Sequence, residues 1–367
     1  MFKIEALTLQ ATAKRLVKGA AKSKLQDKAL FLSTNPTDST VTLFFTGDDV
    51  SVKAVVPVLK AESMEVATTL SEFRHKLSVL PSDEEITVKV EKNALVFVWG
   101  KNSKISCPIL PETTPSIIIP EVTTQVTWSA GSLHGMARIL PPFTASPQSE
   151  QAKSKPVVMG VYLEQDDTGE TLVRATDAYK VVRIRAEKIQ WFHDFACSID
   201  SKTLETLAEI LPIEAEVKIG LNPARTQLIF QAANVTVLAR LLVGVFPNLD
   251  GALKTNGRGK WVFDRMELME VCRRVGILKK TSPTVDFNLR DGKVFAEIPG
   301  TLSQQMAVSI EGEQFEFTVN AYYLELICAL FQGKDEIELI MDSGNHPISV
   351  IHSEDDAIRA LVLPVRR

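Results

Sequence analysis

The chain has 367 residues, of which 45% are apolar and 23% charged, and its formal net charge is −4. These values are typical of a globular protein with two or three domains. No apolar run is long enough to span a bilayer, and the first residues lack the basic region and apolar core of a signal peptide. The four cysteines include no C-x-x-C pair, which disfavours metal and redox sites and predicts reduced thiols in a cytoplasmic protein.

Hydrophobic periodicity and turn residues predict alternating helices and strands along the whole chain. In the first part we expect a helix over 8–21, strands at 41–45 and 50–55, a helix over 64–79, strands near 86–98 and 104–110, and a proline-rich linker over 111–120. Next come a helix at 129–140, a polar loop over 141–156, strands at 157–163 and 171–175, a helix at 201–211, and strands at 215–220, 227–232 and 235–243. The last part has a strand at 261–263, a helix at 264–276 capped by Asp264, strands at 284–289, 293–298 and 304–310, a helix at 320–332, and a final strand at 360–365.

One unit occurs three times in this order. It is a short amphipathic helix, a turn with acidic residues and an alternating strand, and the strands begin near Ile86, Val217 and Ile337. A period of about 120 to 130 residues is too long for a solenoid and indicates repetition of whole domains. We therefore predict an α+β protein of three similar domains, 1–122, 123–250 and 251–367, each with two helices on antiparallel sheets. Domains joined edge to edge through their strands could close into a ring.

Basic residues are concentrated near the N-terminus although the whole chain is acidic. Residues 14–28 hold six basic residues and one acid, a local charge of +5, and Arg273, Arg274, Lys279 and Lys280 form a second basic cluster. Basic helical faces on an acidic protein fit one surface that meets phosphate. The simpler interpretation of each cluster alone is a solvated helix face.

Enzymatic motifs are not found in the sequence. There is no G-x-x-x-x-G-K-[ST] loop and no H-E-x-x-H, and the five histidines are dispersed without metal-ligand spacing. Thr176-Asp177 and Asp48-Asp49 could be taken as carboxylates of a hydrolase. Because they occupy equivalent positions in two repeats, we interpret them as turn residues. We therefore expect no catalytic residues, no metal and no cofactor.

Four segments resemble the bacterial β sliding clamp, the DNA polymerase III subunit beta, in order and spacing. They are Val157–Val161, Ala175–Val181, Phe246-Pro247 and Leu361–Arg366. The resemblance covers the whole chain. It implies a head-to-tail homodimer whose six domains form a ring around duplex DNA, with helices lining the channel and sheets outside. Such a ring would bind DNA without regard to sequence, because basic side chains attract phosphates without fixing a register.

The resemblance also implies which residues would contact DNA, partner peptides and the second subunit. The DNA-facing basic residues would include Lys14, Arg15, Lys18, Lys24, Arg138, Lys153, Lys202 and Arg273. A pocket for short apolar peptides of polymerases, the clamp loader and repair proteins would comprise Val158, Thr176, Ala178, Tyr179, Lys180, Val181, Pro247, Leu361, Leu363, Pro364, Val365 and Arg366. The dimer contacts would be Ile105, Ile277 and Leu278. Taken singly, the apolar strand residues of the pocket are equally typical of a core.

The chain departs from the family pattern at three places. Ala178-Tyr179-Lys180-Val181 stands where the family commonly has Gly-His-Arg-Leu, no basic residue follows Phe246-Pro247 closely, and the chain ends in two arginines. These differences predict an altered peptide preference. They also leave an alternative in which the chain is a monomeric adaptor that binds partner peptides without encircling DNA.

Overall fold

The computed structural model describes residues 1–25, 27–101, 103–112, 119–186, 189–253 and 257–366. By its internal contacts the chain forms two compact units. Unit 1 comprises Met1–Arg138 and Ile199–Leu241, and unit 2 comprises Ile139–Ser198 and Leu242–Arg367. The domain boundaries expected near 122 and 250 stay a prediction. Within the described residues, no helix is both long and apolar enough to cross a membrane.

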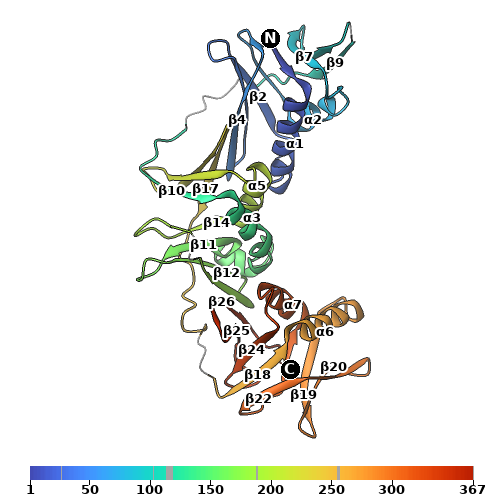
Figure 1. The fold of residues 1–367 in the computed structure, drawn as a ribbon, viewed down its shortest axis with the longest axis vertical. Helices are drawn as coiled ribbons and strands as arrows, with labels where there is room; N and C mark the ends of the chain where they lie inside the picture. The colour runs from blue at the N-terminus through green and yellow to red at the C-terminus, as the bar shows by residue number, and fades with distance from the viewer. Residues whose placement is uncertain (26, 102, 113–118, 187–188, 254–256, 367) are drawn as a thin grey trace. The chain divides into compact units, whose positions relative to one another are not determined.

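A similar order of elements occurs three times (Figure 1). The first repeat contains β1 (Phe2–Glu5), α1 (Ala6–Lys22), β2 (Ala29–Asn35), β3 (Thr40–Thr46), β4 (Val50–Pro57), β5 (Lys60–Ala61), β6 (Glu65–Thr69), α2 (Leu70–Leu77), β7 (Glu85–Glu91), β8 (Ala94–Trp99) and β9 (Ser103–Pro108). The second contains β10 (Thr124–Ser129), α3 (Ala130–Ile139), η1 (Pro141–Phe143), α4 (Glu150–Ser154), η2 (Pro156–Met159), β11 (Gly160–Gln165), β12 (Thr171–Thr176), β13 (Lys180–Arg185), β14 (Cys197–Asp200), α5 (Ser201–Ile210), β15 (Glu216–Leu221), β16 (Gln227–Ala232) and β17 (Val235–Leu242). The third contains β18 (Gly259–Asp264), α6 (Arg265–Leu278), β19 (Thr284–Arg290), β20 (Lys293–Ile298), β21 (Leu302–Met306), β22 (Val308–Gly312), β23 (Phe317–Asn320), α7 (Ala321–Leu330), β24 (Glu336–Met341), β25 (Ile348–His352) and β26 (Asp355–Val362).

Strand pairing repeats with the element order, and all of these pairs are antiparallel. In each repeat the first strand pairs with the strand after the second helix, and the last three strands follow one another: β1-β7-β8-β9, β10-β15-β16-β17 and β18-β24-β25-β26. The strands between the two helices pair as β6-β2-β3-β4, β11-β12-β13 and β23-β19-β20-β21. The predicted α+β class with antiparallel sheets is therefore confirmed.

Strands also join successive repeats edge to edge. Within unit 1, β4 of the first repeat pairs with β17 of the second. Within unit 2, β13 of the second repeat pairs with β26 of the third. Each junction satisfies backbone groups that an isolated domain would expose at its sheet edge.

Side chains cap the starts of several helices. Thr69, Asp200 and Asn320 accept hydrogen bonds from backbone N–H groups at the starts of α2, α5 and α7, and Asp264 caps α6 as predicted. In unit 1, α1 packs beside α5 (Figure 1). The approach is close at Gly19, because a Cβ there would overlap the side chain of Ile210, and the Thr206 hydroxyl donates to the Gly19 carbonyl at 3.0 Å.

Several predicted elements need correction, including the strand expected at 304–310, which is the two strands β21 and β22. The helix expected over 64–79 covers only Leu70–Leu77, because residues 65–69 form β6 and pair with β2. The single strand expected over 86–98 is the hairpin β7-β8. In the second repeat the expected loop contains α4, and Val157 and Val158 lie in the 3-10 turn η2 instead of a strand. Most of the expected 111–120 linker lies outside the described residues.

Candidate functional site

Unit 2 brings the residues of the expected pocket together. Val181 on β13 lies directly opposite Leu361 on β26, and Lys180 lies opposite Val362. After β26 the chain continues beside the β12–β13 turn, where the Leu363 N–H donates to the Tyr179 carbonyl at 2.8 Å. The Val365 N–H then donates to the Thr318 carbonyl on β23 at 2.7 Å. Two segments that are about 180 residues apart in sequence thus lie side by side.

Side chains of its own residues hold the turn between β12 and β13. The Thr176 hydroxyl donates to the Lys180 carbonyl at 2.9 Å and accepts from the Ala178 N–H at 3.0 Å. The Asp177 carboxylate accepts from the N–H groups of Tyr179 and Lys180, each at 2.9 Å. Turn chemistry therefore accounts for Thr176-Asp177, as we expected. Ala178 has φ of 74°, a left-handed conformation that is costly for any residue with a Cβ.

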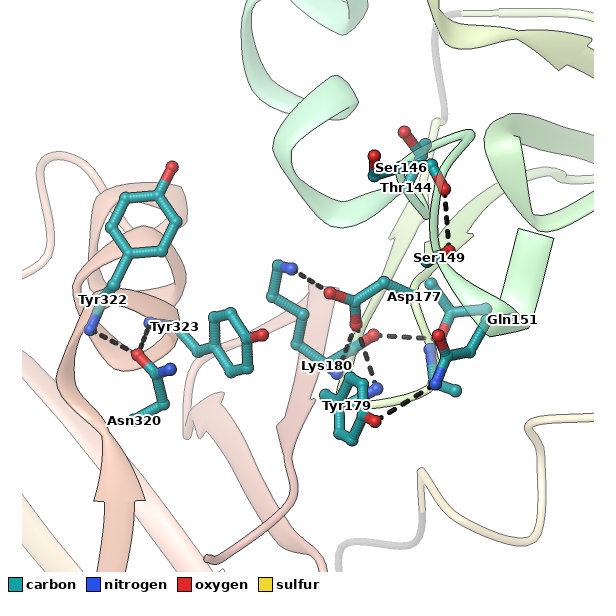
Figure 2. A network of polar contacts seen from close by, with 12 residues as sticks. Thr144, Ser146, Ser149, Gln151, Asp177, Tyr179, Lys180, Asn320, Tyr322 and Tyr323 are labelled. Carbon is teal, nitrogen blue, oxygen red and sulfur yellow. Dashed lines mark hydrogen bonds and ion pairs between the residues drawn. The ribbon is translucent and has the colours of Figure 1, made fainter. Parts of the chain in front are cut away.

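The Lys180 ammonium group is buried and interacts with two neighbouring side chains. Lys180 is only 3% exposed, forms a short ion pair with Asp177, and lies over the ring of Tyr323 at 4.3 Å from the centroid. Figure 2 shows the lysine between these two partners. Desolvation by burial raises the pKa of Tyr323, so its ring faces the cation in the neutral phenol form. The lysine therefore orders the turn and offers little free charge to a ligand.

The apolar residues expected to form the floor of the pocket are buried. Val181 and Leu361 are buried against Leu253, with Leu249 and Leu363 packed beside them. A second cluster contains Val158 and Phe246, with Leu249 packed against it as well. The Phe246 ring stacks on Tyr162 at a centroid distance of 4.4 Å, which fixes the chain just before Pro247. The core interpretation thus holds for the floor residues, and Leu249 links the two clusters.

The residues expected at the rim of the pocket are exposed. Ala178 and Arg366 are exposed, Tyr179 is 48% exposed and Val365 is 38% exposed. The Tyr179 hydroxyl accepts from Gln151 on α4 at 3.1 Å (Figure 2). Sequence reasoning missed Gln151, Leu249, Leu253 and Tyr323. The four-residue spacing of the two leucines after Phe246-Pro247 was a usable signal for Leu249 and Leu253.

The basic residues expected to face DNA lie mainly on helices. In unit 1, Lys14 and Lys18 are exposed on α1, Lys24 is exposed just after it, Arg15 is half-buried, and Arg138 and Lys202 lie on α3 and α5. In unit 2, Lys153 lies on α4 and Arg273 on α6. Arg273 pairs with Glu325 at 2.8 Å, and Lys153 pairs with Glu150 at 2.5 Å. Among these eight, Lys14, Arg15, Lys24, Arg138 and Lys202 form no ion pair with the described residues.

The residues expected at the dimer contact lie in both units. Ile105 is half-buried on β9 in unit 1. Ile277 and Leu278 end α6 in unit 2 and are 73% and 52% exposed. Within the described part of the chain, no group of three or more His, Cys, Asp and Glu residues could hold a metal ion.

Comparisons with known proteins agree with this geometry. No protein-family model matches the chain. A curated protein of Streptococcus pneumoniae named Beta sliding clamp is 23% identical over 346 residues, covering 90% of this chain and 89% of that protein. The crystal structure of the DNA polymerase III subunit beta from Pseudomonas aeruginosa superposes with a TM-score of 0.86 at 20% identity, covering 100% of this chain and 99% of that one.

The chain is similar in sequence and in fold to bacterial β sliding clamps. A third comparison, with the sliding clamp of Bartonella birtlesii bound to griselimycin, gives a TM-score of 0.87 at 17% identity, covering 100% of this chain and 99% of that chain. The resemblance predicted from sequence is confirmed, and the clamp fold extends over the full chain. The three repeats of one α+β arrangement agree with the prediction of three similar domains. The boundaries of these domains stay a prediction.

Proposed function

We propose that this chain is a DNA sliding clamp, a processivity factor that encircles duplex DNA, slides along it and tethers a replicative polymerase. The observation that carries the proposal is the match of the entire chain to the fold of DNA polymerase III beta subunits, supported by sequence relatives named Beta sliding clamp. A non-catalytic role in the cytoplasm belongs to the same proposal.

The ring would consist of two chains joined head to tail. Strands β9 and β21 each lie at the edge of their own sheet, so each offers backbone groups to a strand of a second chain. Ile277 and Leu278 are exposed apolar side chains at the end of α6, and such residues suit a subunit contact. We assign these two residues and Ile105 to the interface of a homodimer.

The helices would carry the contact with DNA. Lys14, Lys18 and Lys24 are exposed on and just after one helix, and such ammonium groups attract any phosphate backbone without reading bases. We expect the residues without internal ion pairs to contribute most. Arg273 would contribute less, because Glu325 neutralises much of its charge.

The surface formed by the β12–β13 turn, β26 and the C-terminal residues would bind short apolar peptides of partner proteins. Its floor is apolar, its rim is exposed, and two aligned backbone segments border it. One clamp of the same fold is bound to griselimycin, which supports a ligand site on this fold. The polymerase, the clamp loader and repair proteins are the partners that we propose.

Oligomeric state gives the most direct test of the ring. We expect light scattering to give a dimer at micromolar concentration and Ile277→Asp to give a monomer. The matched control is Ile213→Asp, because Ile213 is also exposed, at 53%, but lies after α5 and is not among the proposed interface residues. A wild-type monomer would refute the ring and favour the adaptor.

DNA retention tests the encircling topology. After loading by a clamp loader, the protein should stay on circular DNA and be lost when the DNA is made linear. Replacing Lys14 and Lys24 by Glu should shorten retention, whereas Lys218→Glu, at an exposed lysine on β15, should not. Equal retention on circular and linear DNA would contradict sliding.

Peptide binding tests the pocket separately. Deleting residues 363–367 removes the Leu363 and Val365 backbone bonds to Tyr179 and Thr318. We expect this deletion to abolish binding of an apolar peptide in fluorescence polarisation and to leave the dimer intact. Unchanged affinity would refute the pocket assignment.

A further inference from the structure

Three arginines lie in one row across the sheet of unit 2. Arg174 on β12 is directly opposite Arg183 on β13, and Arg183 is directly opposite Arg359 on β26. Arg174 and Arg183 are only 8% and 9% exposed. Like charges directly opposite each other destabilise a sheet, and buried charges need close partners. A row of this kind therefore calls for an explanation.

Carboxylates of the same unit neutralise this arginine row unevenly. Arg174 pairs with Glu164 and Asp250, each at 2.9 Å. Asp356 is shared, because Arg359 and Arg185 both donate to it while Arg183 is 3.7 Å from it.

Arg183 is therefore the member with the weakest pairing. Its closest bond is to the Asp356 backbone carbonyl, at 2.9 Å. The Nε atoms of Arg174 and Arg183 are buried and have no hydrogen-bond partner among the described residues. Burial and the charge of Arg359 both lower the pKa of Arg183. The row thus keeps two buried guanidinium donors without a partner among the described residues, although its three arginines are balanced by three carboxylates.

The row adjoins the floor of the proposed pocket. Val181 and Leu361 face each other across β13 and β26, and Arg183 and Arg359 face each other two residues further along. Side chains two residues apart share a sheet face, about 7 Å from one another. Contacts agree with this placement, because Leu253 packs on Val181 and Leu361, and Asp250, three residues earlier, pairs with Arg174.

We propose that the arginine row binds acidic side chains that flank the apolar motif of a partner peptide. A peptide with its apolar side chain against Leu253, which packs on Val181 and Leu361, would place a nearby side chain toward Arg359 and Arg183. Guanidinium groups hold carboxylates in paired hydrogen bonds, which favours Asp or Glu over neutral residues. The inference rests on the proposed peptide pocket and adds the class of peptide that it prefers.

Peptide carboxylates fit the row better than the phosphates of DNA. The acids around it are more exposed than the buried arginines, with side-chain exposures of 64% for Asp250, 49% for Asp356 and 39% for Glu170. These carboxylates would repel a polyanion that approaches the face. A single carboxylate on a peptide already anchored in the apolar pocket needs to displace only one of them.

The test uses the full chain and matched peptides in fluorescence polarisation. Each peptide carries the same Leu-Phe pair, preceded or followed by two Asp, by two isosteric Asn, or by two Lys. We expect the better Asp peptide to bind about tenfold more tightly than its Asn counterpart at low salt and the Lys peptide to bind more weakly. Arg359→Gln should reduce the ratio of the affinities for the Asp and Asn peptides to about two. Arg185→Gln changes a second partly exposed arginine, which also pairs with Asp356, and should lower the same ratio.

The controls separate the alternatives. Arg240→Gln changes an exposed arginine on β17 and should leave the ratio unchanged. If wild type binds the Asp and Asn peptides with equal affinity, the arginine row does not recognise acidic side chains, and the proposed pocket is unaffected. Binding of none of the peptides would overturn the pocket together with this inference. A loss of duplex DNA binding in Arg359→Gln, at an unchanged peptide ratio, would assign the row to phosphate and refute the peptide assignment.

Discussion

The Asp177–Lys180 pair gives a sharp test of how the pocket turn is held. Asp177→Asn keeps the side-chain oxygen that accepts from the N–H groups of Tyr179 and Lys180, so the turn retains its backbone bonds. It removes only the negative charge facing a lysine that is 3% exposed. Lys180→Met keeps the apolar stem of the side chain and removes the positive charge.

The expected cost follows from the surroundings of Lys180. Two unit charges about 4 Å apart attract by about 4 kcal/mol at an effective dielectric constant of about 20. The face of Tyr323 still stabilises the unpaired ammonium by about 2 kcal/mol. We therefore expect Asp177→Asn to lower the free energy of unfolding by about 2 to 4 kcal/mol, and Lys180→Met by about 1 to 2 kcal/mol. The double variant should recover about 2 kcal/mol relative to the sum, because neither charge is then left alone.

Urea unfolding followed by circular dichroism measures all three variants. Asp167→Asn is the matched control, since Asp167 is an exposed aspartate in the turn between β11 and β12 and should change stability by less than about 0.5 kcal/mol. A change within about 0.5 kcal/mol for Asp177→Asn, or strictly additive single variants, would refute the view that this pair holds the turn.

Three further predictions concern stability. Ala178→Gly should raise the free energy of unfolding by about 1 kcal/mol, because Ala178 has φ of 74° and an exposed methyl group; a loss would contradict the strain. Gly259→Ala should cost about 2 kcal/mol or more, because a Cβ would overlap the Glu313 carbonyl, whereas Gly251→Ala has open space and should cost little in the same urea titration. Burial opposes ionisation of Asp356, but hydrogen bonding and charge from Arg359 lower its pKa overall. The ionised Asp356 therefore stabilises the fold above its usual pKa of about 3.9, and this stabilisation is lost as pH falls through the lowered pKa. The free energies of unfolding of wild type and Asp356→Asn should differ most near about pH 6 and converge near about pH 2. A difference that stays constant with pH would contradict this prediction.

Local sequence patterns predicted many of the helices and strands. The alternating strands expected near Ile86, Val217 and Ile337 begin one residue earlier, at Glu85, Glu216 and Glu336. Amphipathic helices and N-caps are also local signals, and Asp264 was identified in this way. The errors arose where distant pairing overrides local preference. Residues 65–69 continue a helical pattern in sequence but form a strand because β2 lies beside them.

The sequence by itself determined that one α+β unit occurs three times and that the segments resembling a clamp pocket are present, because periodicity and order are properties of neighbouring residues. Only the tertiary structure decided that Val181 lies opposite Leu361, that Leu253 packs on both, and that the Lys180 ammonium lies over the Tyr323 ring. It also decided that arginines from three strands fall into one row. Strand register between segments about 180 residues apart depends on packing of the whole sheet, and a one-residue shift would turn every one of these side chains to the other face.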